Sequence, residues 1–103
     1  MILLAEHLPE FAGELRRLLT YQPDLEASIG SLSIVDKCRC GDVVCASFYR
    51  MPPPKGAWGP GHENIVLDPA DGWVILDVID GRIGMVEVLY RQDVKDSIEK
   101  LIP

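Results

Sequence analysis

The chain has 103 residues, of which 48% are hydrophobic and 25% are charged, a composition typical of one soluble globular domain over residues 1–103. Its 16 Asp and Glu outnumber its 10 Lys and Arg, so the formal net charge is −6. This balance disfavours nucleic acid and anionic membranes as partners, because both bind basic surfaces. No apolar run reaches the ~18 residues of a membrane span, and no basic residue precedes the short apolar start as in a signal peptide. A cytoplasmic protein with free thiols is expected, since the cysteine count of 3 is odd.

Three segments have the apolar spacing of amphipathic helices. Apolar residues recur along one face of Leu8–Leu19, and a shorter helix is predicted over Pro23–Ile29. Near the C-terminus, Gln92–Ile102 places Val94 and Ile98 four residues apart. The chain therefore has two predicted N-terminal helices and one C-terminal helix.

A first β-hairpin is predicted around Gly41-Asp42, which lies between two β-prone runs as a two-residue turn of the Gly-first type. The turn fixes a register that puts all three cysteine side chains on one side of the hairpin. The pairs expected from it are Cys40 with Val43, Cys38 with Cys45, Asp36 with Ser47 and Ile34 with Tyr49.

A second hairpin is indicated by Asp80-Gly81 between Trp73–Ile79 and Arg82–Tyr90, and a strand over Asn64–Asp68 precedes it. Both faces of this hairpin are largely apolar, so either the terminal helices divide between them or a partner chain covers one. One face is expected to hold Val74, Leu76, Val78, Ile83, Met85 and Leu89, and the other Trp73, Ile75, Asp77, Arg82, Val86 and Val88. The element order predicts an α+β fold with a single antiparallel sheet of about five strands in a meander.

Two stretches carry a resemblance to a known group of sequences. The family of short uncharacterised bacterial proteins that the chain resembles is indicated by Ile34-Val35-Asp36-Lys37-Cys38-Arg39-Cys40-Gly41-Asp42 through Tyr49, together with Gly59-Pro60-Gly61-His62 through Leu89-Tyr90. The final hairpin, with Asp80-Gly81-Arg82-Ile83, is also similar to a widespread small β-rich domain of unknown function. The resemblance implies a bacterial cytosolic setting and supports the fold, and it implies no activity or catalytic residue.

The three cysteines are the sharpest local feature, since Cys38, Cys40 and Cys45 fall within eight residues. Zinc takes four such ligands at about 2.3 Å, and His62 is the candidate fourth ligand. The spacing differs from the common C-x₂-C pair, and no second pair is present. A redox pair is the second interpretation, because Cys38 opposite Cys45 would lie within disulfide range. In the third interpretation the thiols pack as small hydrophobic side chains, and no cofactor is bound.

A segment without secondary-structure pattern runs from Arg50 to Glu63 and is the candidate binding loop. Trp58, flanked by small residues, offers a large apolar surface, and Arg50 and His62 offer polar contacts. In the alternative interpretation Trp58 folds back and caps an open part of the sheet.

Catalytic patterns are lacking, because no serine has a nucleophile-elbow context and neighbouring strand residues such as His62 and Glu63 point to opposite faces. Asp77 and Glu87 are carboxylates within apolar strands, for which an edge position or pairing with Arg82 or Arg91 would account.

The absence of a catalytic pattern and the acidic charge favour a small interaction module that binds another protein or forms a homodimer. The alternative is a thiol-based zinc-binding or redox-sensing domain centred on the cysteine hairpin. A third and weaker hypothesis is a small-molecule enzyme with a cleft between the sheet and the loop.

Overall fold

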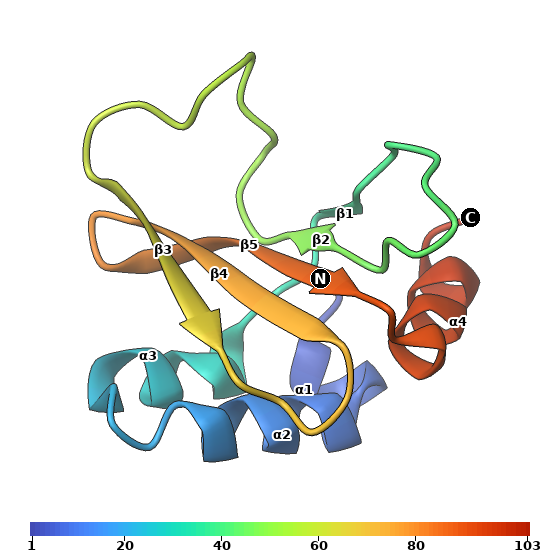
Figure 1. Cartoon of the computed structure of the whole chain (residues 1–103), viewed down its shortest axis with the longest axis horizontal. Coiled ribbons are helices and arrows are strands. Elements are labelled where there is room, and N and C mark those ends of the chain that lie inside the picture. The colour runs from blue at the N-terminus through green and yellow to red at the C-terminus, as the bar shows by residue number, and fades with distance from the viewer.

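The computed structural model describes residues 1–103 and confirms an α+β fold with a single five-stranded antiparallel sheet (Figure 1). Its helices are α1 (Leu4–His7), α2 (Pro9–Leu18), α3 (Pro23–Ser28) and α4 (Gln92–Leu101), and a 3-10 turn spans Ile29–Ser31. Its strands are β1 (Asp36–Lys37), β2 (Phe48–Tyr49), β3 (His62–Leu67), β4 (Trp73–Ile79) and β5 (Arg82–Leu89). The one-turn helix α1 was not predicted, because its four residues are too few to show a helical repeat.

The strand order is β1-β2-β5-β4-β3, so the meander prediction holds for β3, β4 and β5 but not for the whole sheet. Strand β2 pairs with β5 instead of β3, with Phe48 opposite Val86 and Tyr49 opposite Met85. The chain between β2 and β3 therefore has to cross from β2, next to one edge of the sheet, to the opposite edge. It does so as a long loop over residues 50–61.

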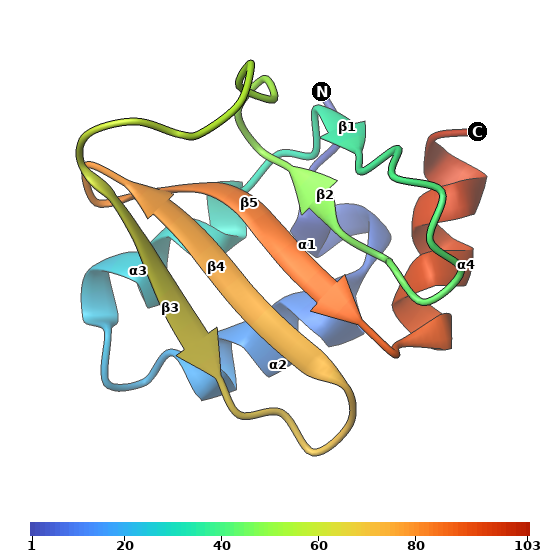
Figure 2. The same cartoon turned by 45° about the horizontal axis from the view of Figure 1, so that its top comes forward.

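The helices do not divide between the two sheet faces. Helices α1, α2 and α3 lie together on one side of the sheet, and α4 packs beside the end that carries β1 and β2 (Figures 1 and 2). One hydrophobic core of 21 buried residues joins these helices to the inner sheet face. Phe48 is fully buried at its centre, where its ring meets that of Phe11 edge to face at 6.3 Å. None of the helices is long and apolar enough to cross a membrane.

The turn between β4 and β5 is the predicted one, with positive φ angles at Asp80 and Gly81 (51° and 81°). Three residues further on, Gly84 forms a β-bulge, because Val78 pairs with Ile83 while Asp77 pairs with Met85. The extra residue reverses the faces of the rest of β5. Val86 and Val88 are therefore buried in the core, and the predicted face assignment beyond the bulge is wrong.

The first hairpin is also paired differently from the prediction. Asp36 lies opposite Tyr49 and Lys37 opposite Phe48, two positions out of the expected register. Gly41 and Asp42 are not a two-residue turn but part of an irregular loop over residues 38–47, which we call the cysteine loop. A shift of two residues leaves every side chain on the face that was predicted for it.

The outer face of the sheet, the one away from the helices, is partly covered by the loop over residues 50–61 (Figure 2). The carbonyl of Gly84 accepts hydrogen bonds from the backbone N–H groups of Arg50 (2.8 Å) and Met51 (3.0 Å), which anchors the start of the loop. Trp58 then folds back over the bare Cα of Gly84, where an added Cβ would lie 3.2 Å from the indole ring. This geometry corresponds to the capping interpretation of Trp58.

Candidate functional site

The structure brings the three cysteines of the cysteine loop together. The sulfurs of Cys38, Cys40 and Cys45 all lie within 4.8 Å of one another. Cys40 is exposed, Cys38 and Cys45 are half-buried, and all three are free thiols. None of them belongs to the hydrophobic core.

A cavity of about 370 Å³ lies between the cysteine loop and α4. The loop contributes all three cysteines to its wall, and α4 contributes Lys95, Ile98 and Glu99. The cavity lies where the cysteine loop runs beside α4 (Figure 2).

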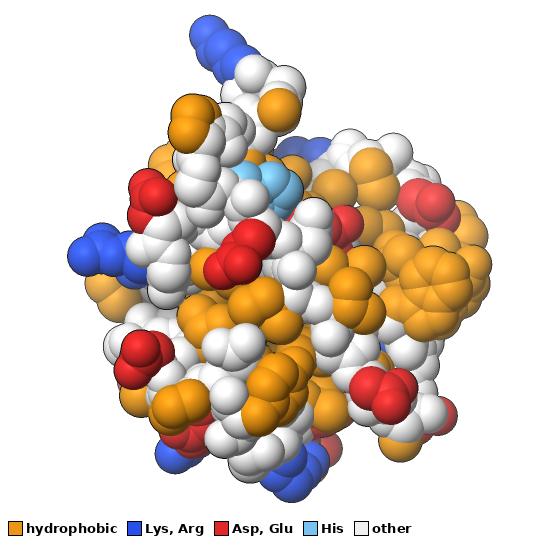
Figure 3. Space-filling model, turned by 60° about the vertical axis from the view of Figure 1, so that its left-hand side comes forward, with side chains coloured by type: hydrophobic (Ala, Val, Ile, Leu, Met, Phe, Trp, Pro, Cys, Tyr) orange, Lys and Arg blue, Asp and Glu red, His pale blue; other side chains and the backbone are white.

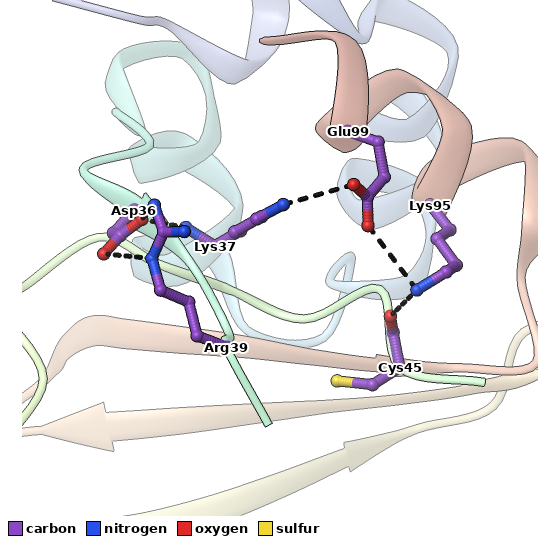
Figure 4. A network of polar contacts seen from close by, with 6 residues as sticks. All are labelled: Asp36, Lys37, Arg39, Cys45, Lys95 and Glu99. Carbon is purple, nitrogen blue, oxygen red and sulfur yellow. Dashed lines mark hydrogen bonds and ion pairs between the residues drawn. The ribbon is translucent and has the colours of Figure 1, made fainter. Parts of the chain in front are cut away.

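Charged side chains from two elements form a network at this cavity (Figure 4). Lys37 and Lys95 both reach the carboxylate of Glu99, at 3.1 Å and 3.6 Å. The Lys95 ammonium also donates to the carbonyl of Cys45 at 3.2 Å. The Lys37 ammonium holds the pKa of Glu99 below its usual value. With Arg39 and Asp42, which also line the wall, three cations face two carboxylates, so the wall beside the thiols has a positive balance.

The environments of the thiols differ. Burial is the main cause that raises the pKa of the Cys38 thiol to about 11. The backbone N–H of Asp42 points at the Cys40 sulfur at 3.5 Å and, together with the neighbouring thiol of Cys45, lowers the pKa of Cys40. Of this pair, Cys40 therefore has the more accessible and more readily ionised sulfur.

Ser47 is a supporting residue that the sequence did not single out. It is buried, and its hydroxyl oxygen accepts the backbone N–H of Val88 at 2.9 Å. The Cys45 thiol donates to the same oxygen at 3.3 Å. Through Ser47, strand β5 thereby orients the Cys45 side chain, although the two are far apart in sequence.

His62, the expected fourth metal ligand, is not part of the cysteine group. It lies at the start of β3, and its Nε2 is 2.7 Å from Asp77 Oδ1. Asn64 donates to the same carboxylate oxygen at 2.8 Å. The histidine that the sequence offered to the thiols is thus held by a carboxylate on β4.

The predicted binding-loop residues separate into two places. The Trp58 ring packs between Tyr49 and His62, with centroid distances of 6.4 Å and 6.3 Å. Arg50 instead lines a small cavity at the other face, beside Ser28 of α3 and the turn after β4. The three residues therefore do not form one continuous binding surface.

Asp77 and Glu87 are diagonal neighbours on the outer side of β4 and β5, because Asp77 pairs with Met85 and the bulge at Gly84 turns Glu87 outwards. Asp77 is buried, and its Oδ2 has no hydrogen-bond partner. The neighbouring Asp77 carboxylate, together with burial, raises the pKa of Glu87 to about 7. The expected explanations are wrong, since β4 and β5 are interior strands and Arg91 instead binds Glu14 with two contacts of 2.8 Å.

Comparison of the chain with protein-family models, with curated proteins and with solved structures finds no match. The geometry of the cysteine loop and of the outer sheet face is therefore the basis for the functional argument.

Proposed function

We propose that the protein binds a thiophilic metal ion, with Zn²⁺ as the first candidate, through Cys38, Cys40 and Cys45. The observation that carries this proposal is the grouping of the three sulfurs within 4.8 Å at the wall of a cavity. Clustered thiols outside a hydrophobic core have little value for packing, whereas thiolate is the preferred protein ligand of soft metal ions.

The sulfur positions need little change to coordinate zinc. Tetrahedral zinc with bonds of about 2.3 Å separates its thiolate ligands by about 3.8 Å. The widest sulfur separation therefore has to contract by only about 1 Å. All three side chains come from the irregular cysteine loop, whose backbone can make this adjustment without breaking a long strand ladder.

The surroundings also suit a negatively charged centre. Three thiolates around a divalent ion leave a single net negative charge. Lys37 and Lys95 line the same wall and offset that charge, and Lys95 already bonds the Cys45 carbonyl. With His62 engaged by Asp77, the fourth coordination position is open to water or to an exogenous ligand in the cavity.

The test is titration of Zn²⁺ into the reduced protein, followed by native mass spectrometry and calorimetry. We expect one zinc ion per chain, and a loss of about 100-fold or more in affinity for Cys40→Ser and Cys45→Ser. The matched control His62→Gln, outside the cluster, should keep the affinity of the parent protein. Absence of stoichiometric zinc, or equal affinity in Cys40→Ser, would refute the proposal.

We propose protein interaction, with a second copy or another protein, as the second candidate function. The observation in its favour is an exposed aromatic pair: Trp73 and Tyr90 are each 60% exposed and meet edge to face at 5.7 Å. Hydrophobic side chains form patches on the surface, separated by acidic groups (Figure 3). Light scattering after size exclusion tests self-association, and a dimer that Trp73→Ser converts to a monomer would support it. A protein that is monomeric and binds no other protein through Trp73 and Tyr90 would count against this function.

A further inference from the structure

We propose that Cys40 is a peroxide-reactive thiol that forms a disulfide with Cys45. This reaction would regulate the site described above, so its effect on metal release rests on the proposed function. The formation of the disulfide itself does not depend on a metal.

Cys40 is the natural point of attack because it is the one exposed thiol of the cluster. A hydroperoxide has to reach the sulfur, and the half-buried Cys38 and Cys45 are less accessible. The backbone N–H of Asp42 points at the Cys40 sulfur at 3.5 Å, so it stabilises negative charge on that atom. The exposure of its sulfur and the backbone N–H of Asp42 therefore both favour Cys40 as the thiol that reacts with a hydroperoxide.

Cys45 is the better partner for Cys40 of the two remaining thiols. It lies on the opposite arm of the cysteine loop, and the four residues between them, 41–44, belong to no strand. Cys38 is held next to β1, where its backbone N–H bonds the Ser47 carbonyl at 2.8 Å. In extended chain, residues two apart have Cα atoms about 6.6 Å from each other, near the upper limit for a disulfide. Cys45 is anchored by its bridge with Leu89, and the Val44 carbonyl accepts a hydrogen bond from Tyr90, so a movement of residues 40–43 brings Cys40 to Cys45 without that constraint.

The reaction is a two-electron oxidation by a hydroperoxide. The Cys40 thiolate attacks one peroxide oxygen, the O–O bond breaks, and the leaving oxygen takes a proton to give water or an alcohol. The sulfenic acid formed on Cys40 is then attacked by the Cys45 sulfur. An S–S bond forms, the S–O bond breaks, and the hydroxide leaves as water with the proton of the Cys45 thiol.

Formation of this bond would remove two of the three metal ligands. Cys38 alone cannot hold the ion, because a single thiolate lacks the chelation that the cluster provides. Peroxide would therefore release the metal, and a thiol reductant would restore the site.

The first experiment treats the metal-free, reduced protein with hydrogen peroxide and follows thiol number and intact mass. We expect free thiols to fall from three to one, with a mass loss of about 2 Da and a Cys40–Cys45 link in the peptide map. Cys40→Ser should react at least about 10-fold more slowly. Cys45→Ser should instead accumulate a dimedone-trapped sulfenic acid on Cys40. A Cys38–Cys45 link, or unchanged kinetics in Cys40→Ser, would overturn the assignment.

The second experiment adds peroxide to the zinc-loaded protein and measures released zinc with a chromogenic chelator. Release that parallels the disulfide supports the regulatory step, and retention of zinc after disulfide formation refutes it. The failures are distinguishable, because a protein that binds no zinc but forms the Cys40–Cys45 bond refutes the proposed function alone. A protein that binds zinc and forms no disulfide refutes this inference alone.

Discussion

Replacement of Glu87 by glutamine tests the carboxyl pair on the outer sheet face. The folded-state pKa of Glu87 is raised from 4.5 to about 7 by the adjacent Asp77 carboxylate and by burial. The protonated form is therefore the one that the fold stabilises. This contribution to the free energy of unfolding is fully present below pH 4.5 and is lost as the pH rises to about 7. Glutamine resembles the protonated acid at every pH, and its amide can donate to the unpartnered Oδ2 of Asp77.

The size of the effect follows from the shift. A change from 4.5 to about 7 corresponds to an upper limit of about 3.4 kcal/mol. Glu87 is partly exposed, and solvent screening reduces that figure to about 1–2 kcal/mol. At pH 8 we expect the free energy of unfolding of Glu87→Gln to exceed that of the parent protein by this amount. At pH 5 we expect the two proteins to be nearly equal in stability.

Urea denaturation of both proteins at pH 5, 6, 7 and 8 measures this difference in stability. The neighbouring titratable groups His62 and Asp77 are present in both proteins, so the difference between the two curves reports on Glu87. The matched control is Glu63→Gln, which removes an exposed carboxylate from β3 and should leave the pH dependence unchanged. A constant stability difference between Glu87→Gln and the parent protein from pH 5 to pH 8 would refute the reasoning.

Three further substitutions probe the packing. Gly84→Ala should cost about 1–3 kcal/mol and shift the fluorescence of Trp58, because the new methyl group would lie 2.5 Å from Ile79 Cδ1 and 3.2 Å from the indole ring. Unaltered fluorescence would contradict the fold-back of this ring. Arg91→Met should cost about 1–3 kcal/mol in thermal unfolding, since it leaves the partly buried Glu14 carboxylate without its two 2.8 Å contacts; adding Glu14→Gln should recover part of the loss. Phe48→Ala should cost about 3–5 kcal/mol in urea denaturation, since the ring is fully buried, and a smaller loss would mean that the core collapses around it.

Local patterns predicted the helices and the second hairpin well. The apolar repeat of Leu8–Leu19 and the Asp80-Gly81 turn act over a few residues, so both can be recognised without knowledge of the rest of the fold. The pairing of β2 with β5 could not be recognised in this way. It depends on Phe48 reaching the same core as Val86, a contact between residues far apart in the chain.

The candidate site was predicted in part. The closeness of Cys38, Cys40 and Cys45 was predicted from side-chain alternation in a regular hairpin; the structure shows this closeness, but in the irregular cysteine loop. The pairing of β3 with β4 was predicted, but the engagement of His62 by Asp77 was missed, because the predicted strand began at Asn64 and left His62 in the preceding loop.

The bulge at Gly84 gives β5 a property comparable to a reading frame. The odd-numbered Ile83 faces the core before the bulge, and the even-numbered Val86 and Val88 face it after the bulge. One added residue therefore decides which alternate side chains meet the core. Loss of the one extra residue, Gly84, would remove the bulge and leave Val86 and Val88 facing the core, because Ile83, Met85 and Val86 would then alternate as in a regular strand. Loss of two residues between Ile83 and Val86 would instead turn both valines outwards. In this segment of the chain, the number of residues inserted or deleted therefore matters more than their chemical identity.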